Sequence, residues 1–423
     1  RNINAYIKAG IPVGYERTYT GDMADAVQNN IAMVFDYDNY LTDSYFGRSK
    51  VDVMENTFRF NITYAHYFTQ RSSLNAGASY YARMMNDNYN HFGSNDGYAW
   101  VLQNNSSLME PGVFAEYTYQ IEEKFSLVAG IRGDYAMVGN NYYVKDAKNK
   151  FLVTPRAHIK WNITPRTTLR ASAGLGSRRQ NLVTDNIWMM TTSRDIRFDG
   201  LTDDMEAAAT FGGSIAQTFR LAGDDQATIS FDYFRTQLYH SVIVDQERDA
   251  ENIYVYTTDG KSYTNTYQVD LSWTPAERLD IFATFRYTDS KYTITRADGS
   301  TQLVERPLVS RYKTLLNIQY ATRMRKWTFD VTAQLNGKSR IPTQTGNIEQ
   351  SEYSPVYPMF FAQVTRKIKQ WDIYLGCENI AGYKQNNPIL GYATPYDTTF
   401  NSACVWGPLM GRKIYIGVRF NLY

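Results

Sequence analysis

Segments in which apolar and polar side chains alternate recur along the whole chain. In FRFNITYAHYF, residues 58–68, Phe58, Phe60 and Ile62 share one face, while Arg59 and Asn61 share the other. WTFDVTAQL, residues 327–335, repeats the pattern, as do KFSLVAGIRGDY, ATISFDYF, RLDIFATFRY and WDIYLGCEN. Strict alternation predicts strands with one apolar face. The alternating segments are about 9 to 11 residues long, which is the length of a tilted strand crossing a bilayer.

Composition favours a membrane β-barrel over other classes. No run approaches the roughly 18 consecutive apolar residues of a transmembrane helix. The mean hydropathy is −0.46, a value that barrel strands also give because their two faces average. With 44 basic and 42 acidic residues the net charge is only +2, so no nucleic-acid partner is expected. Aromatic residues make up 15% of the chain and gather near strand ends, as in interfacial girdles. A soluble β-sandwich is the alternative.

Connections between the predicted strands are short and long in turn. Short polar ones lie at 69–73, 120–124, 163–167, 222–226, 274–278, 322–326 and 366–370. Longer ones lie near 37–52, 87–110, 138–150, 176–205, 241–261, 337–356 and 381–410. This order predicts an all-β, transmembrane, antiparallel up-and-down barrel with tight turns at one rim and long loops at the other. RADGS, residues 296–300, is expected to be a tight hairpin on the long-loop side. The long interval at 13–28 has no explanation beyond an insertion.

The strand count raises a question of completeness. We count about 17 strands, from INAYIKAGIPV to KIYIGVRFNLY, whereas bacterial single-chain barrels have even numbers and no free edge. The count therefore predicts that part of the barrel precedes Arg1, with a miscount by one strand as the alternative. The chain also begins without Met or a signal segment, as a mature or truncated piece would. Residues 1–423 are expected to form a single domain.

Five stretches carry a family resemblance in a consistent order. They are PGVFAEYTYQIEEKFSLVAGIRGDY (111–135), FLVTPRAHIKWNITPRTTLRASAGLGSRRQNLVTDN (151–186), ISFDYFRTQLYHSVIVDQE (229–247), GCENIAGYKQNNPILG (376–391) and VWGPLMGRKIYIGVRFNL (405–422). They resemble the mid-barrel and later hairpins of TonB-dependent outer-membrane receptors, in the form typical of Bacteroidetes.

The resemblance implies the C-terminal part of a barrel of about 22 strands that closes around a plug. The plug, the TonB-contacting segment and the first strands would lie outside this sequence. The implied function is active uptake of a scarce, large solute across the bacterial outer membrane: a ferric siderophore, haem, cobalamin, a metal complex or a glycan. The implied partners are the TonB complex, the barrel-insertion machinery, the lipid bilayer and in some members a surface lipoprotein, with one barrel per chain. No cofactor and no covalent chemistry are expected.

The loop at 176–205 is the most suggestive for ligand binding. Arg178, Arg179 and Arg194 would hold an anion by charge-assisted hydrogen bonds, and Trp188, Met189 and Met190 offer an adaptable apolar surface. The alternative is a short amphipathic segment that packs inside the barrel mouth. A Cu(I) site at Met189 and Met190 is disfavoured because no Met-x-x-Met series and no Cys or His cluster accompanies them, so no metal site is predicted.

The loop at 381–410 is the second candidate. Tyr392 and Trp406, with Tyr383 and Tyr396, would stack on the face of a sugar or macrocycle. Equally, they would be girdle residues at the barrel rim. In both loops the ligand-contacting role and the structural role remain open.

Two other functions compete with active uptake. A passive porin has 16 to 18 strands around an open channel and is separated from a receptor only by the family resemblance and the apparently missing start. An outer-membrane hydrolase would need a nucleophile and a His that converge. The four histidines, His66, His91, His158 and His240, lie on separate segments without HExxH or GxSxG context. Cys377 and Cys404 are expected to be free thiols.

The closing segment KIYIGVRFNLY is predicted to be a barrel strand that also carries an assembly signal. Ile414, Ile416 and Val418 would face lipid, with Phe420 and Leu422 in the same register. Tyr423 falls out of that register and is interpreted as an interfacial ring beyond the signal. Phe420, Leu422 and Tyr423 are therefore the candidate assembly residues.

Overall fold

The computed structural model describes residues 2–11, 29–46, 49–92, 100–140, 142, 144, 147–179, 182, 184–191, 194–202, 205–221, 226–249, 251–343, 351–395 and 400–421. Within 2–11 and 29–46 only the backbone is described. The predicted insertion at 13–28 lies outside these residues, as do Tyr396, Leu422 and Tyr423.

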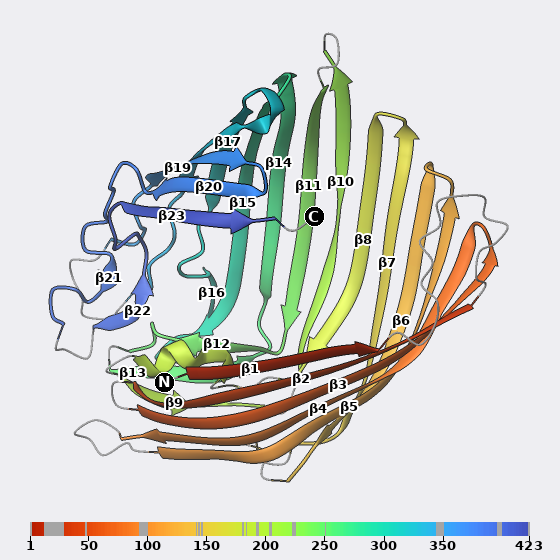
Figure 1. Ribbon diagram of the computed structural model, residues 1–423. Helices are drawn as coiled ribbons and strands as arrows, with labels where there is room; N and C mark the ends of the chain where they lie inside the picture. Colours follow the sequence, from red (N-terminus) through yellow and green to blue (C-terminus); the bar gives the residue numbers. More distant parts are fainter. Residues whose placement is uncertain are drawn as a thin grey trace.

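One sheet of 18 strands forms the wall of the described chain. Apart from the short strand β16, its strands pair antiparallel in chain order, from β1 to β23, and curve around a central space (Figure 1). The strands are β1 (Asn2–Ile11), β2 (Asn29–Phe46), β3 (Ser49–Thr69), β4 (Ser72–His91), β5 (Trp100–Ile121), β6 (Phe125–Val138), β7 (Lys150–Thr164), β8 (Thr167–Arg178), β10 (Glu206–Arg220), β11 (Gln226–Tyr239), β14 (Ser262–Ala276), β15 (Leu279–Thr295), β16 (Thr301–Glu305), β17 (Tyr312–Ala321), β18 (Trp327–Asn336), β19 (Tyr357–Ile368), β20 (Trp371–Glu378) and β23 (Lys413–Phe420). The predicted all-β, antiparallel up-and-down architecture is confirmed.

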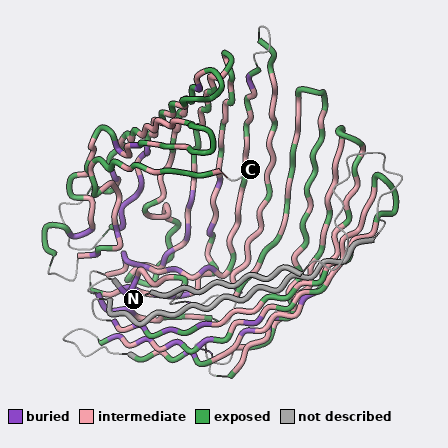
Figure 2. The backbone as a smooth tube through the Cα atoms, viewed as in Figure 1, coloured by how far each residue is buried: buried purple, intermediate pink, exposed green. Residues whose placement is uncertain are grey.

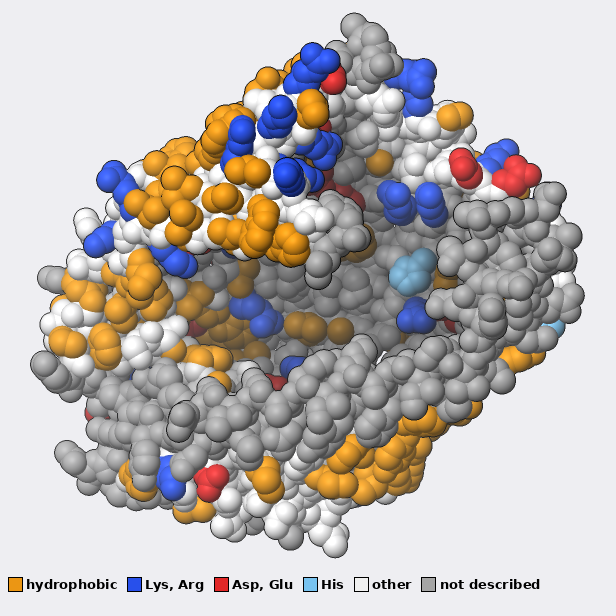
Figure 3. All heavy atoms as spheres, in the orientation of Figure 1, with side chains coloured by type: hydrophobic (Ala, Val, Ile, Leu, Met, Phe, Trp, Pro, Cys, Tyr) orange, Lys and Arg blue, Asp and Glu red, His pale blue; other side chains and the backbone are white. Residues whose placement is uncertain are grey.

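The two faces of the wall differ as the alternation predicts. Along β23, Ile414 and Ile416 are 73% and 76% exposed on the outer face, and Arg419 lies opposite Asp372 on the other face. Hydrophobic side chains cover large outer areas of the molecule, while Lys, Arg and His side chains are visible in its hollow (Figure 3). Exposed apolar groups on this scale suit contact with lipid, where charged groups would be costly.

All seven predicted short connections join neighbouring strands. Thr69 and Ser72 close the turn between β3 and β4, and the 3₁₀ segment η3 (Arg323–Arg325) forms the turn between β17 and β18. The hairpin at 296–300 is confirmed too, since Gly299 adopts φ +80°, a conformation that suits glycine in a tight turn. After it, β16 pairs with the end of β15 and β17 pairs with the rest of β15.

Two predicted long loops are wrong. Most of 37–52 and most of 87–110 belong to β2, β3, β4 and β5, and the ladders continue to Phe46↔Ser49 and to His91↔Trp100. At 49–53 and 87–91 sequence alternation fades because these strand ends do not place one face in lipid. Instead Val51, Val53 and Tyr89 are almost fully buried against elements inside the wall.

A small folded unit fills the long-loop end of the wall. It contains the 3₁₀ segment η2 (Thr184–Thr191) and a three-stranded sheet of β9 (Asp195–Phe198), β12 (Ser241–Asp245) and β13 (Asn252–Thr258). The last long loop adds the pair β21 (Ile389–Leu390) and β22 (Asn401–Val405). Buried residues gather in this region (Figure 2), so the hydrophobic core lies here rather than along the wall.

Three smaller features are the cysteines, the end of the closing strand and the helices. Cys377 and Cys404 are free thiols, as predicted. Phe420 is the last residue of β23, and its ring lies 4.6 Å from that of Trp371. Among the described residues, no helix is long and apolar enough to cross a membrane.

Candidate functional site

Three consecutive residues at the end of β12 connect the long loops to one another. Asp245, Gln246 and Glu247 are each less than 8% exposed, and each binds a different part of the long-loop end. We call these three residues the loop hub. The hairpin β12–β13 places them there because β13 pairs in parallel with β9 of the preceding long loop.

Glu247 forms a buried ion pair with Arg340. Its two oxygens accept hydrogen bonds from Nη1 and Nη2 of Arg340 at 2.6 and 2.7 Å, and the side chains are 2% and 8% exposed. The amide of Thr343 also donates to Glu247, at 2.8 Å. Arg340 donates a further bond to the carbonyl of Glu305. The pair therefore joins the loop after β11 to the loop after β18.

Gln246 connects two further loops. Its backbone carbonyl accepts a 2.8 Å bond from Arg194, and its side-chain oxygen accepts bonds from Asn401 at 2.7 Å and from the thiol of Cys404 at 3.1 Å. Burial lowers the pKa of Arg194 and raises the pKa of Cys404 to about 11. Both effects follow from exclusion of water, which disfavours the charged form of each group.

Asp245 connects the hub to the wall. Its oxygens accept bonds from the amide of Glu247 at 2.8 Å and from the hydroxyl of Tyr256 at 3.2 Å. Tyr256 in turn accepts a bond from the amide of Thr295, at the end of β15. Burial is the main cause that raises the pKa of Asp245, and the neighbouring Glu247 adds to it.

The predicted arginines of the 176–205 loop divide into exposed and buried positions. Arg178, at the end of β8, is exposed and pairs with Glu206 at 2.9 Å and with Asp185 at 3.5 Å. Arg179 donates to the carbonyl of Lys148 and lies over the ring of Tyr142. Arg194, by contrast, has no exposed surface.

The predicted apolar residues of the same loop lie in the core. Met189 and Met190 are 0% and 1% exposed and pack with Leu182 and Ile196, while Trp188 covers the edge of the cluster. This is the arrangement of a short amphipathic segment packed inside the barrel mouth. Sequence could not separate it from a binding surface, because both need apolar side chains on one side of a loop.

The two predicted ligand-binding residues of the 381–410 loop, Tyr392 and Trp406, differ in their exposure. Tyr392 is 45% exposed, whereas Trp406 is half-buried against Ile341, Leu390 and Cys404. The structure brings Arg194, Met189, Met190 and the region of Cys404 to the same end of the wall, but it does not gather all the predicted binding residues around one cavity.

A hydrogen-bonded chain of Ser49, His91 and Asp195 has the residue types of a hydrolase triad. Ser49 Oγ lies 3.0 Å from His91 Nδ1, and His91 Nε2 lies 3.2 Å from Asp195 Oδ1. All three are at most 3% exposed, so a substrate could not reach the serine. Their contact fixes β9 to the ends of β3 and β4, and it is structural.

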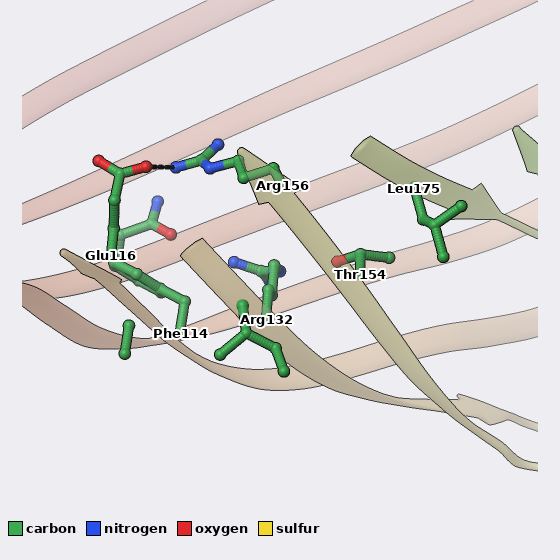
Figure 4. Close-up of a pocket in the computed structure, with 9 residues that line it drawn as sticks. Phe114, Glu116, Arg132, Thr154, Arg156 and Leu175 are labelled. Atoms are coloured by element: carbon green, nitrogen blue, oxygen red, sulfur yellow. Dashed lines mark hydrogen bonds and ion pairs between the residues drawn. The ribbon is translucent and has the colours of Figure 1, made fainter. Parts of the chain in front are cut away.

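Pairs of oppositely charged side chains line the inner face of the wall at β5, β6 and β7. A cavity of about 320 Å³ lies over β5, β6, β7 and β8, with Glu116 and Arg156 projecting toward each other across it (Figure 4). Their ion pair measures 2.5 Å. Arg132, in the same cavity, donates two bonds to Asp134 at 2.6 and 2.7 Å. Such neutral pairs give a hydrated wall without a strong net field.

The sequence analysis did not identify the residues of the loop hub. Glu247 lies inside a stretch that resembles the family, but no local pattern marks it as buried or names its partner. Arg340 follows 93 residues later. Their pairing depends on two loops meeting at one rim, which the curvature of the sheet provides.

Comparisons with known proteins assign the chain to a family. The family model described as "TonB dependent receptor-like, beta-barrel" matches residues 6–380. No curated protein matches the chain. Its family and its structural neighbours are receptors and transporters, not enzymes.

Solved structures of outer-membrane receptors share the fold of this chain. The siderophore receptor PiuA from Acinetobacter baumannii is 16% identical, with a TM-score of 0.63 over 99% of this chain and 64% of that one. The copper transporter OprC is 12% identical, with a TM-score of 0.66 over 94% and 63%. The ferric yersiniabactin uptake receptor FyuA from Yersinia pestis is 12% identical, with a TM-score of 0.62 over 93% and 59%. This chain thus spans less than two thirds of the length of each of these receptors.

Proposed function

Because the chain belongs to the TonB-dependent receptor β-barrel family of the bacterial outer membrane, we propose that it forms part of an active importer of a scarce, large solute. Residues 1–423 would form the C-terminal portion of the barrel as a single domain, in the form typical of Bacteroidetes. The family match carries the proposal. A wall with an apolar outside, charged pairs inside and a folded set of loops at one rim supports it.

The proposed route follows the wall. A ligand would arrive at the long-loop end, which we assign to the outside of the cell, and pass along the lumen lined by Glu116, Arg132 and Arg156. Energy would come from the TonB complex. The insertion machinery would assemble the barrel, one per chain, and a surface lipoprotein is a further possible partner.

The predicted ligand residues take different roles in this proposal. Arg178 and Tyr392 are exposed and would contact the ligand directly. Arg179, Trp188 and Trp406 would hold the surfaces next to them. The buried Met189, Met190 and Arg194 would act by fixing the loops in position.

Uptake by a deletion strain tests the proposal. Cells that lack the gene are supplied with single sources of iron complex, copper, haem, cobalamin or glycan, and accumulation is measured with and without TonB. We expect at least one source to require both the gene and TonB. Uptake that needs the gene but persists without TonB would instead identify a passive channel, and normal accumulation of every source in the deletion strain would contradict an uptake role.

A further inference from the structure

A second cavity, of about 420 Å³, lies on the inner face of β17, β18 and β19. Its volume falls within the roughly 300–1,000 Å³ typical of small-molecule sites. Lys313 is paired with Asn336, and Asn336 with Tyr357. Directly opposed residues of antiparallel strands project from the same face, so these three side chains form one row. Gln334 and Phe361 line the cavity in the rows below.

The last long loop forms the roof of this cavity, through Trp406 and its neighbours. The amide of Trp406 donates to the carbonyl of Pro388 at 3.0 Å, and the amide of Gln385 donates to the carbonyl of Pro408 at 3.0 Å. Trp406 also packs on the buried Leu390 and Cys404. The roof is therefore fixed in place before any ligand arrives, which lowers the entropic cost of binding.

The described side chains that line the cavity carry a positive charge and no negative charge. Among the residues that the structure describes, Lys313 is the only charged one in the lining of this cavity, and it forms no ion pair with any of them. The neighbouring cavity, which shares Phe361, is lined instead by Asp330 and by Glu378, whose carboxylate pairs with Lys413 at 3.5 Å. The charge that remains in this second cavity is that of Asp330. An anion would therefore be attracted to the first cavity and repelled by the second.

The remaining groups suit a ring that carries hydroxyl groups. Phe361 and Trp406 offer aromatic faces. Gln334 donates to Asn336 at 2.8 Å, which leaves the Gln334 oxygen and the Asn336 amide hydrogens for a ligand. Tyr357 stacks on Tyr383 with ring centroids 5.6 Å apart, and among the described residues its hydroxyl has no hydrogen-bond partner.

We propose that this cavity, the Lys313 pocket, binds a small ring that bears a carboxylate and neighbouring hydroxyl groups. The carboxylate lies at Lys313, the hydroxyl groups bind Gln334 and Asn336, and the ring packs against Phe361 and Trp406. A role of the pocket in uptake rests on the proposed function. Ligand binding by the pocket is independent of that function, because binding is measurable on the purified protein without transport.

The test is calorimetric titration of the purified full-length gene product in detergent. The probes are glucuronate, an acidic sugar ring, and 2,3-dihydroxybenzoate, an acidic aromatic ring with two hydroxyl groups; glucose and glucosamine are the neutral and cationic controls. We expect one of the two acids to bind, and which one binds identifies the ring. We expect neither control to bind comparably, and affinity for the acid to fall at high salt.

Variants locate the site. Lys313→Met should weaken binding of the acid about tenfold or more, because a charge-assisted hydrogen bond is lost, while Lys313→Arg should retain most of it. Lys326→Met, at the opposite rim, and Asp330→Asn, in the neighbouring cavity, should not weaken it. Absence of binding by both acids, equal binding of glucose, or unchanged binding by a folded Lys313→Met protein would each overturn the proposal. If the acids bind and transport fails, the proposed function is wrong and the pocket stands.

Discussion

Arg340 and Glu247 form a doubly hydrogen-bonded ion pair almost completely shielded from water, although 93 residues separate them. Both charges lie in loops rather than in the wall. The loops that meet there are consequently fixed to one another, not merely adjacent.

Removal of one partner should loosen both loops. Glu247→Gln would leave the Arg340 guanidinium buried without a counter-charge, at a cost of about 3–5 kcal/mol. We expect faster amide hydrogen exchange in 241–247 and 338–343, and partial recovery in the double variant Glu247→Gln/Arg340→Met. Arg248→Ala removes the more exposed pair with Asp199 and serves as the control, with an expected effect of about 1 kcal/mol or less. Equal exchange in Glu247→Gln and Arg248→Ala would show that the buried pair does not hold the loops.

Two glycines of the last hairpin should resist substitution. Gly417 lies opposite Tyr374 and Gly376 lies opposite Tyr415, and a Cβ at either glycine would overlap the ring opposite. Gly417→Ala should therefore destabilise the folded barrel by about 1–3 kcal/mol, measured as the heating temperature at which the compact band is lost on a gel. Gly176→Ala in β8 is the matched control, since nothing lies within 4 Å of its Cβ. A Gly417→Ala protein as heat-resistant as Gly176→Ala would contradict the packing argument.

The thiol of Cys404 should be unreactive in the folded protein. It is 1% exposed, and burial raises its pKa to about 11, so only about one thiol in a thousand would be ionised at pH 8. In a Cys377→Ser background we expect iodoacetamide to label Cys404 only after unfolding in urea, as measured by intact mass. Rapid labelling without urea would mean that the last long loop opens readily.

Acidification should tighten the hub through Asp245. Since burial raises its pKa in the folded protein, the folded state binds a proton more readily than the unfolded state. The cost of burying this carboxylate is therefore present at neutral pH and disappears as pH falls through the raised pKa. We expect amide exchange in β13, corrected for the intrinsic rate, to slow as the pH is lowered from 7 toward the ordinary carboxyl range. Asp245→Asn should reduce that dependence and keep β13 at least as protected at pH 7; an unchanged pH dependence would assign it to other groups.

The sequence predicts the wall well, because lipid on one side and water on the other force a period of two on segments such as 58–68 and 327–335. Prediction from sequence fails where the strands no longer have lipid on one face and water on the other. At 49–53 and 87–91 one face packs on a protein core that also takes polar residues such as Ser49 and Asp87, so burial still alternates but residue type does not. These strand ends were therefore interpreted as loops.

The loops are harder to predict for a related reason. Met189 and Met190 look the same in sequence whether they face a ligand or a core, and only their packing on Leu182 and Ile196 decides it. The partners of Glu247 and Gln246 are far away in the chain, so no spacing rule finds them. Trp406 was predicted as a binding residue, but the row formed by Lys313, Asn336 and Tyr357 becomes visible only once strand register is known.

The loop hub also decides where foreign sequence would be tolerated. Asp245, Gln246 and Glu247 serve several loops at once, so a peptide inserted among them would disturb all of those loops together. Among the described residues, the Asp298-Gly299 turn makes no direct bond to the hub, and the side chain of Asp298 accepts hydrogen bonds from Ser300 in the same turn. An epitope or affinity tag for labelling this rim is best placed in that turn.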